Sequence, residues 1–295
     1  MHAKRRFALI GLAVCLIAAA FYLLTIRVMV PANPLGSVRR WFIFLNYDLS
    51  KIKLDADRLS SYEMAILDPD VHPPFELFSK KTILMAYVSL GEAEDYRSYW
   101  TNLKDYSWIL GENENWKGNF YADVRDPAWH AIILRDVLPK IVREGFRGIF
   151  MDTLDTAEYL ESKDPEKFAG SRRAMSDLVL EIRAVFPELL LISNNGFAIL
   201  PEIAPILNGM LVEDITMMPD FEKGGYRKVL PEERDPKVAV LRPLAKKYHL
   251  PVFSIDYARE GDRFTREICQ EESRKLGFRP YVAEKDLSEL YEQAI

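Results

Sequence analysis

Eight short apolar segments constrain the fold of this 295-residue chain more than any other feature. They predict strands at 41–49, 64–70, 83–92, 148–152, 189–196, 209–215, 252–258 and 278–284. Short apolar runs bounded by turn residues are typical of strands buried on both faces, and helices between them indicate a parallel sheet. Eight strand-and-helix repeats favour an α/β fold of the closed (β/α)8 barrel type, with an open doubly wound sheet as the alternative. No glycine-rich fingerprint follows the first strand, which argues against a dinucleotide site.

The segments between the strands predict helices and two long connections. Helical spacing indicates a helix over 128–145, which Pro139 should bend or break. Further helices are expected from Asp164-Pro165 to Pro187, and over 197–207, 236–249, 262–276 and 286–294. Residues 93–127 and 216–235 are read as long loops, and the first is rich in aromatic residues. Loops of this length inside a compact domain are usually functional.

The first thirty residues differ from the rest of the chain. Lys4, Arg5 and Arg6 precede an unbroken apolar run from 7 to 26. About 20 apolar residues suffice to cross a bilayer, and the preceding basic cluster favours the cytoplasmic side. We therefore expect residues 1–30 to be a signal anchor, or alternatively a cleaved signal peptide, with 31–40 a linker and 41–295 the barrel. The barrel would then be extracytoplasmic and tethered to the membrane, or secreted if the segment is removed.

The net charge of the residues after position 30, called the body below, argues against nucleic acid as a partner. The chain has a net charge of −5, and its first thirty residues hold four basic and no acidic residues, so the remainder carries −9. Binding of nucleic acid relies on cationic residues, so an acidic body is a poor nucleic-acid partner. It suits a neutral or cationic substrate. Cys269 is the only cysteine after residue 30, so the body can form no internal disulfide.

Polar side chains gather where the predicted strands end. They are Asp48, Asp68, Glu92, Asp152, Asp155, Asn194, Asn195, Glu213 and Asp256. Taken singly, such residues often cap helices or fill turns, which is the interpretation for Asp68 and Asp155. Asp152 and Glu213 follow the fourth and sixth strands, and alternate strands of a barrel contribute to one inward layer. We therefore expect both carboxylates in one cavity, with Asp214 facing away from the barrel axis.

Two carboxylates at one rim can cleave a glycosidic bond. One protonates the departing oxygen, and the other attacks the anomeric carbon or activates a water. Aromatic residues of the 93–127 loop could stack on sugar faces or simply pack against the rim. The four histidines lack zinc-motif spacing, and no Gly-x-Ser-x-Gly elbow is present. An oxygen-ligand metal site from Asp152, Asp155, Glu213 and Asp256 is a minor alternative; no cofactor is expected.

From about Trp41 to the C-terminus, the chain resembles glycoside hydrolase family 114, the endo-α-1,4-polygalactosaminidase group. The resemblance rests on the opening strand with Tyr47, on YVSLGE at 87–92, on the Asp-Val-Arg-Asp-Pro-x-Trp segment at 123–129, and on GIFMDTLD, SNNGF and VEDI. It implies a (β/α)8 barrel with Asp152 and Glu213 as the catalytic pair, and analogy with other α-acting barrels makes Asp152 the nucleophile and Glu213 the general acid/base. It also implies substrate contacts near Tyr47, Tyr87, Glu92, Asn195, Asp256 and Tyr281, to which the strand-end position adds Asp48.

Three functions follow in order of support. The first is a membrane-tethered glycosidase that cuts a galactosamine-rich, possibly cationic polysaccharide at internal linkages. The second is a catalytically silent barrel that binds glycan in an export or assembly complex, which a wide separation of Asp152 and Glu213 would favour. The third is a metal-dependent lyase or aldolase. The sequence predicts no oligomeric state.

Overall fold

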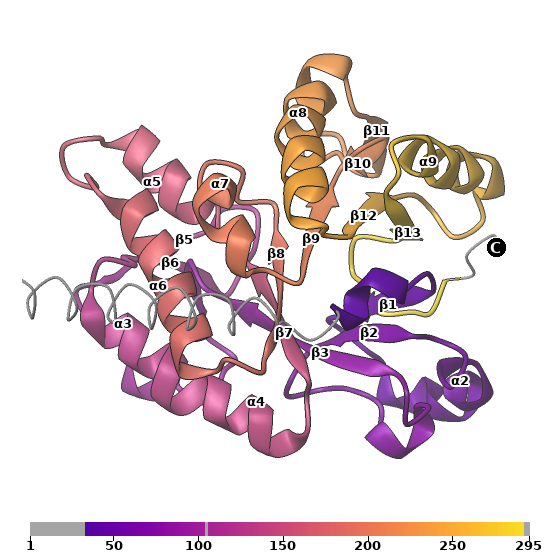
Figure 1. Cartoon of the computed structure of the whole chain (residues 1–295), viewed down its shortest axis with the longest axis horizontal. Coiled ribbons are helices and arrows are strands. Elements are labelled where there is room, and N and C mark those ends of the chain that lie inside the picture. The colour runs from indigo at the N-terminus through magenta and orange to yellow at the C-terminus, as the bar shows by residue number, and fades with distance from the viewer. Residues whose placement is uncertain (1–32, 104–105, 292–295) are drawn as a thin grey trace, which may run out of the picture. The chain divides into compact units, whose positions relative to one another are not determined.

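The computed structural model describes residues 33–103 and 106–291, and the predicted barrel is confirmed (Figure 1). Its eight strands are β1 (Trp41–Phe44), β2 (Met64–Leu67), β3 (Ile83–Ser89), β7 (Gly148–Asp152), β8 (Leu190–Asn194), β9 (Gly209–Glu213), β12 (Val252–Tyr257) and β13 (Arg279–Ala283). Each pairs in parallel with the next in chain order. A doubly wound sheet reverses its strand order part-way, so that alternative is excluded.

The first and last strands meet through side chains. No backbone ladder between β13 and β1 is present in the part of the chain that the structure describes. Instead, the Trp41 ring lies 5.4 Å from the Tyr281 ring, between centroids, and its Nε1 donates a hydrogen bond of 3.1 Å to the Arg279 carbonyl. Both rings are fully buried. Aromatic packing therefore closes the barrel at this seam.

Strand β7 lies unusually close to its neighbours. A Cβ atom at Gly148 would lie 2.5 Å from the Leu190 carbonyl oxygen and 2.6 Å from the Met85 side chain. Real Cβ contacts are never this short, so only glycine permits the approach. This close packing fixes the position of the strand that ends in Asp152.

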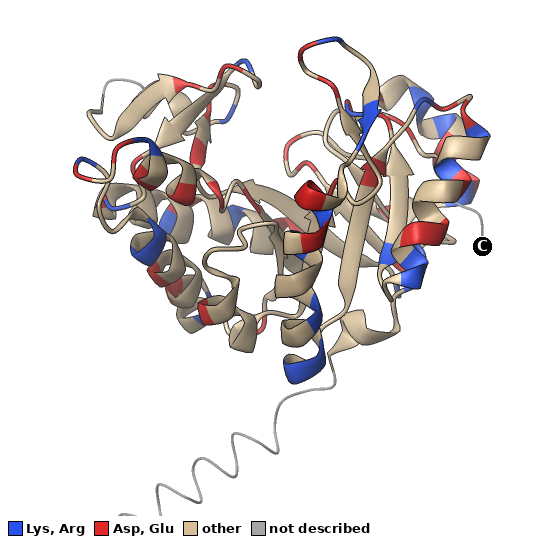
Figure 2. Cartoon of the chain, turned by 90° about the horizontal axis from the view of Figure 1, so that it is seen from above, with Lys and Arg blue, Asp and Glu red and all other residues tan. Residues whose placement is uncertain are grey.

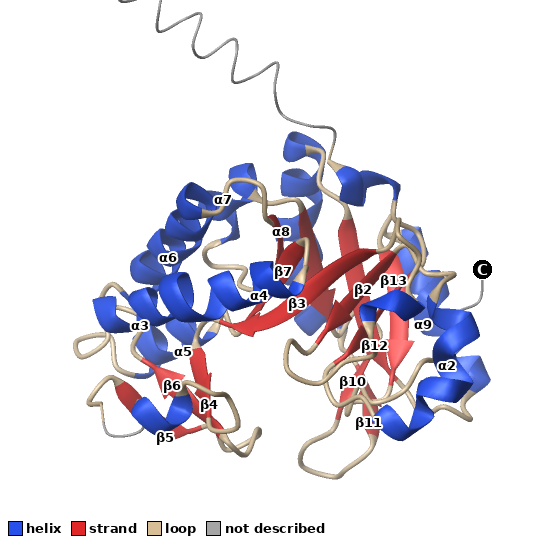
Figure 3. Cartoon of the chain, turned by 90° about the horizontal axis from the view of Figure 1, so that it is seen from below, coloured by secondary structure: helices blue, strands red, loops and turns tan. Residues whose placement is uncertain are grey.

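Helices surround the barrel strands, as Figure 3 shows. The α-helices are α2 (Ile52–Leu59), α3 (Pro127–Ile132), α4 (Leu138–Glu144), α5 (Thr156–Lys163), α6 (Ser171–Val185), α7 (Leu200–Ile203), α8 (Pro231–Tyr248) and α9 (Arg263–Lys275). Short 3₁₀ turns are η1 (Pro34–Ser37), η2 (Leu49–Lys51), η3 (Phe75–Leu77), η4 (Trp100–Asn102) and η6 (Ala204–Ile206). Only a 3₁₀ turn joins β2 to β3, so not every repeat carries an α-helix.

Several predicted helix boundaries are corrected. Pro139 does disturb the expected 128–145 helix: the π-helical turn η5 (Ile133–Val137) separates α3 from α4, because proline has no amide hydrogen for the regular ladder. Asp164 ends α5, which was not predicted, instead of opening the next helix. Helix α8 begins before Pro236, at Pro231. Residues 286–291 are not helical, and 292–295 lie outside the described residues.

Both predicted long loops contain sheets. Within 93–127, the strands β4 (Glu92–Glu94), β5 (Ile109–Glu112) and β6 (Asn119–Ala122) form a three-stranded antiparallel sheet. Within 216–235, β10 (Met217–Pro219) and β11 (Tyr226–Lys228) form a hairpin. The two small sheets rise on the same side of the barrel (Figure 3), and acidic residues gather along that side (Figure 2).

The predicted anchor or signal segment, 1–30, lies outside the described residues, as do the first two residues of the predicted linker. Among the helices of the described ranges, none is long and apolar enough to span a membrane.

Candidate active site

Three neighbouring strands, β7, β8 and β9, end in Asp152, Asn194 and Glu213. The Asn194 Nδ2 donates hydrogen bonds of 2.7 Å to Asp152 Oδ1 and 2.6 Å to Glu213 Oε1. Because one nitrogen makes both bonds, the two acceptor oxygens are at most 5.3 Å apart, the sum of the two lengths. The structure therefore brings the two predicted catalytic carboxylates together.

The residue after each of these strand ends has a left-handed backbone. Thr153, Asn195 and Asp214 have φ values of 59°, 45° and 62°. Such values are uncommon for non-glycine residues and persist where the surroundings hold them. The Thr153 hydroxyl bonds Ser89 Oγ and the Gly91 amide, each at 2.8 Å, and Asn195 Oδ1 accepts from the Glu213 amide at 3.2 Å. These contacts tie adjacent strand ends to one another.

The environment of Glu213 favours its protonated form. Burial raises the pKa of Glu213, and the nearby Asp152 carboxylate raises it further. Hydrogen bonds from the Tyr257 hydroxyl and from Asn194 oppose that shift, as does the Lys237 ammonium. Burial and a like charge both disfavour an ionised carboxyl, so Glu213 retains a proton above the ordinary range of a glutamate.

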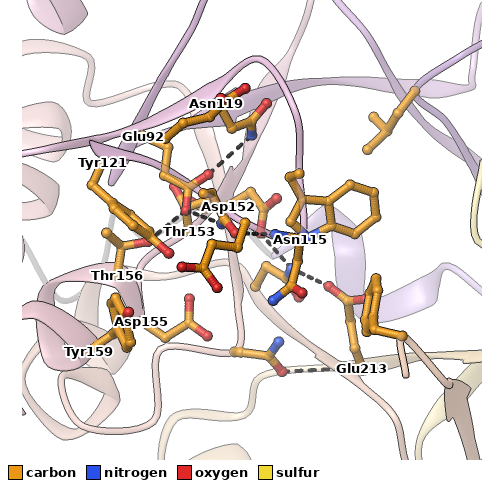
Figure 4. A pocket seen from close by; sticks show the side chains of 18 of the residues that line it. Glu92, Asn115, Asn119, Tyr121, Asp152, Thr153, Asp155, Thr156, Tyr159 and Glu213 are labelled. Carbon is orange, nitrogen blue, oxygen red and sulfur yellow. Dashed lines mark hydrogen bonds between the residues drawn. The ribbon is translucent and has the colours of Figure 1, made fainter. Parts of the chain in front are cut away.

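Glu92 lies beside this pair. It belongs to β4 of the small three-stranded sheet, whereas the sequence predicts it at the end of the barrel strand that became β3. Its carboxylate accepts hydrogen bonds from Asn113 at 2.8 Å, Asn119 at 3.1 Å and the Thr156 hydroxyl at 3.3 Å (Figure 4). Burial raises the pKa of Glu92, and these donors lower it in part. The donors fix the orientation of the carboxylate.

Two further carboxyls reach this site: Asp155, which the sequence places here only in the minor metal alternative, and Asp214, which was expected to face away. Asp155 takes the N-cap position of α5, but its side chain makes no capping hydrogen bond and lies in the cavity (Figure 4). Neighbouring protein atoms and Asp152 raise the pKa of Asp155 to about 6, although the residue itself is exposed to solvent. Asp214 also lines the cavity rather than facing away from it. Its Oδ1 is buried without a hydrogen-bond partner, and burial beside Glu213 raises its pKa to about 8.

These side chains share an open cavity of about 930 Å³, called the strand-end cavity below. Its aromatic lining comes from the barrel strands β3 and β12, from the two small sheets and their loops, from α5 and from the segment after α5: Tyr87, Tyr96, Trp116, Tyr121, Tyr159, Phe168, Phe221 and Tyr257. Trp116 and Phe221, each about half exposed, meet edge to face with 5.9 Å between ring centroids. Among the other aromatics of the 93–127 segment, Tyr99 and Trp108 pack on Trp129 instead.

The predicted substrate-contact residues divide into two groups. Tyr87, Glu92 and Asn195 line the strand-end cavity. Tyr47, Asp48, Asp256 and Tyr281 do not. The Tyr47 hydroxyl bonds Asp55, Asp48 caps the turn η2 at Ser50, and Tyr281 closes the barrel seam. Each of these four side chains therefore has a partner within the protein, and none of them lines the strand-end cavity.

The alternative hypothesis of an oxygen-ligand metal site loses one of its four proposed ligands, Asp256. Asp256 Oδ1 accepts hydrogen bonds from the amides of Ile215 at 3.0 Å, Thr216 at 2.6 Å and Met217 at 2.9 Å. These bonds shape the turn after β9 and occupy the carboxylate. Within residues 33–103 and 106–291, no three His, Cys, Asp or Glu side chains converge as metal ligands would.

Sequence reasoning missed several residues of the cavity wall. Tyr159 and Phe221 are among them, because their segments were not read as a helix and a hairpin. Tyr159 lies four residues after Asp155, a spacing that puts both on one helix face once α5 is recognised. Phe221 carried no comparable signal, since its place depends on how the hairpin folds over the barrel.

Comparison with known proteins gives consistent matches. The sequence model of glycoside-hydrolase family GH114 matches residues 37–294. An uncharacterized protein of Deinococcus radiodurans is 30% identical over 287 residues, covering 89% of this chain and 88% of the relative. An uncharacterized protein of Thermotoga maritima is 28% identical over 284 residues, covering 85% and 84%.

Two solved structures share the fold. The glycoside hydrolase domain of PelA from Pseudomonas aeruginosa has a TM-score of 0.71 and 23% identity, covering 86% of this chain and 98% of that domain. Ega3 of Aspergillus fumigatus, in complex with galactosamine, has a TM-score of 0.62 and 16% identity, covering 85% and 92%. At these identities the two structures support the barrel architecture.

Proposed function

Because this chain belongs to glycoside-hydrolase family GH114, we propose that it hydrolyses a polysaccharide rich in α-linked galactosamine or N-acetylgalactosamine at internal linkages. The binding of galactosamine by the structurally similar Ega3 supports this choice of sugar. The acidic body supports a partly deacetylated, cationic polymer, because opposite charge favours encounter. An open cavity with aromatic rings on several walls supports binding of more than one sugar unit.

The observation that carries the mechanism is the Asn194 bridge. Carboxyl groups about 5 Å apart suit retaining hydrolysis, whereas inverting enzymes leave roughly 6.5–9.5 Å for a water. The bridged oxygens of Asp152 and Glu213 meet the shorter condition. We therefore propose a retaining, two-step reaction.

In the first step, Glu213 donates its proton to the glycosidic oxygen while Asp152 attacks the anomeric carbon. The sugar–oxygen bond breaks, and a covalent glycosyl ester forms on Asp152. In the second step, Glu213, now a carboxylate, takes a proton from water, and the resulting hydroxide displaces Asp152 from the anomeric carbon. The raised pKa of Glu213 supports its role as the acid. The Asn194 amide hydrogen bond holds the Asp152 side chain in place for the attack.

The test is release of oligosaccharides from an α-1,4-galactosamine polymer by the full chain. Asp152→Asn and Glu213→Gln should each lower kcat by about a thousandfold or more, as loss of a reacting group does in other hydrolases. Asp57→Asn and Glu188→Gln remove exposed carboxyls outside the cavity and should leave the rate unchanged. Thermal melting of each variant checks that it is folded. Full activity of either cavity variant would refute the assigned pair.

The stereochemistry of the product tests retention separately. Proton NMR during early turnover should show the α anomer first, because two displacements restore the starting configuration. A β product would contradict the two-step reaction without excluding hydrolysis.

The silent glycan-binding alternative finds less support. It requires the two carboxylates to lie apart or to be tied off in structural ion pairs. They are bridged by one amide, and no salt bridge among the described residues includes either of them.

We further propose that the apolar segment at 7–26 holds the barrel at the outer face of a membrane. The basic residues before the segment and its length support this location. Fractionation of cells that express the full chain tests it: recovery with the membrane is expected, and recovery in the cytosol would contradict it.

A further inference from the structure

One wall of the strand-end cavity combines two carboxylates with two tyrosine rings (Figure 4). Glu92 and Tyr121 face each other across the β4–β6 pairing. Asp155 and Tyr159 are one helical turn apart at the start of α5, and the Tyr159 amide bonds the Asp155 carbonyl at 2.9 Å. The Tyr121 and Tyr159 rings lie 5.4 Å apart, between centroids. These four residues are called the acidic–aromatic wall below.

No cation of the described residues forms an ion pair with Asp155. Asp155 does not cap α5, and no salt bridge in the described ranges includes it. Asp152, Glu213 and Glu92 all repel its negative charge. Glu92, in contrast, is held by three neutral donors, which orient its charge but do not cancel it. An added cation would relieve this repulsion.

The geometry suits an organic cation better than a metal ion. Hard metal ions need several oxygen ligands converging on one point, and no such group of side chains occurs among the described residues. An ammonium group on a larger molecule needs only one or two carboxylates and benefits from aromatic faces nearby.

The chain itself places an ammonium group on this wall. Lys163 Nζ lies 5.3 Å from the centroid of the Tyr159 ring and donates a hydrogen bond of 3.1 Å to its hydroxyl. The Tyr159 ring therefore already lies against a primary ammonium group, that of Lys163. Lys163 also lines the cavity, where its positive charge would oppose a second cation.

We propose that the acidic–aromatic wall binds the ammonium group of an unacetylated amino sugar beside Asp152, with Asp155 as the residue that sets this specificity. Acetylation of the amine removes the positive charge and adds bulk, so an N-acetylated sugar loses the attraction. The inference rests on the proposed function for the identity of the polymer.

The first experiment measures binding and does not depend on cleavage. Calorimetry with the full chain compares galactosamine with N-acetylgalactosamine. The wild-type chain should bind galactosamine about tenfold more tightly, the effect of one charge-assisted contact. Asp155→Asn should remove most of that preference. Glu158→Gln takes a carboxyl from the same helix outside the cavity lining and should leave the preference intact.

A second variant shifts the preference in the opposite direction. Lys163→Gln removes the competing ammonium group and should raise the preference for galactosamine about threefold, a partly screened effect. A purely structural role of α5 would not produce opposite changes at Asp155 and Lys163. Equal preference in the wild-type chain and Asp155→Asn would overturn the proposal, as would tighter binding of N-acetylgalactosamine by the wild-type chain.

The affinity should also depend on pH. The pKa of Asp155 is raised to about 6 by its surroundings and by Asp152, Glu213 and Glu92, while its own amide opposes the shift and Lys163 lies on the same helix. Protonation of Asp155 removes its charge, so galactosamine affinity should fall as the pH drops from 7 to 5. Asp155→Asn should flatten this dependence, and an unchanged slope would count against Asp155.

Measuring cleavage distinguishes a failure of the proposed hydrolase function from a failure of the specificity role of Asp155. If the wild-type chain cleaves the polymer, Asp155→Asn should lower the ratio of kcat/KM for deacetylated over acetylated polymer about tenfold. An unchanged ratio would overturn the specificity role while leaving the hydrolase intact. If the wild-type chain cleaves neither polymer, the proposed function fails, and the binding measurements alone decide whether the wall takes an ammonium group.

Discussion

At the scale of single residues, the site depends on side chains that couple carboxyl groups. Asn194 joins Asp152 to Glu213, and the Tyr257 hydroxyl bonds the other oxygen of Glu213. Both donors stabilise the ionised form of Glu213, while burial and Asp152 favour the protonated form. These opposing effects together set the pKa of Glu213, the proposed acid, so a single substitution can shift that pKa.

Tyr257→Phe should shift the basic limb of the activity profile. Loss of the hydroxyl removes a hydrogen bond that lowers the pKa of Glu213, so that pKa should rise. Because the first step needs a protonated Glu213, activity falls as pH rises through its pKa, and the fall should move to higher pH. The measurement is kcat/KM against pH. Tyr248→Phe, on α8 outside the cavity, serves as the control, and a basic limb that moves to lower pH would contradict the assignment of Glu213 as acid.

At the scale of elements, one buried arginine attaches the three-stranded sheet to the barrel. Arg97 follows β4, and its guanidinium lies 2.8 Å from Asp68 at the end of β2, 2.7 Å from Asp70 and 2.8 Å from Glu94 on β4. Asp68 does fill a turn, as predicted, since it accepts from the amides of Asp70 and Val71. Its pairing with Arg97 could not be predicted, because the partner lies 29 residues away.

Arg97→Met should destabilise the fold by roughly 3–5 kcal/mol, because it leaves two buried carboxylates, Asp68 and Glu94, without their cation, whereas Asp70 keeps its pair with Lys140. Urea unfolding at pH 7 measures this change. Burial raises the pKa of Glu94, so lowering the pH neutralises that carboxyl first and should shrink the difference. Arg172→Met, which breaks an exposed pair with Glu161, should change stability very little. Comparable effects of both substitutions would refute the special role of Arg97.

The elements that sequence reasoning missed are short or irregular. Strands β4, β5 and β6 have three or four residues each, and a register shift interrupts the β5–β6 pairing. Such strands are too brief to show a period of two, whereas the barrel strands are continuous apolar runs. Helix α5 was missed because only three of its eight residues are buried, which leaves little apolar pattern.

At the scale of the whole molecule, the negative net charge and the placement of carboxylates around the cavity both favour a cationic substrate. The net charge of the chain is −5, and the carboxylates that line the strand-end cavity come from β4, β5, β7 and β9, from the start of α5 and from loops next to these elements. A charged cleft attracts an oppositely charged substrate over a distance comparable to the Debye length, about 10 Å at 0.1 M salt.

Cleavage of a cationic polymer should therefore depend on salt. Raising sodium chloride from 50 to 500 mM should lower kcat/KM for deacetylated polymer several-fold, because added ions screen the attraction. The rate on fully N-acetylated polymer, which is neutral, should change little and serves as the control. Equal salt sensitivity of both polymers would contradict electrostatic attraction.

The sequence by itself determined the eight-stranded barrel and the candidate catalytic pair. Apolar runs must be buried, parallel strands need helical crossovers, and alternate strand ends face one interior, so these features follow from local pattern. Only the tertiary structure decided which polar groups meet. Asp155 faces the cavity instead of capping its helix, Asp256 accepts three amides, and Asn194 bridges two carboxylates. Those outcomes depend on backbone angles and on contacts between residues far apart in the chain, which no local pattern encodes.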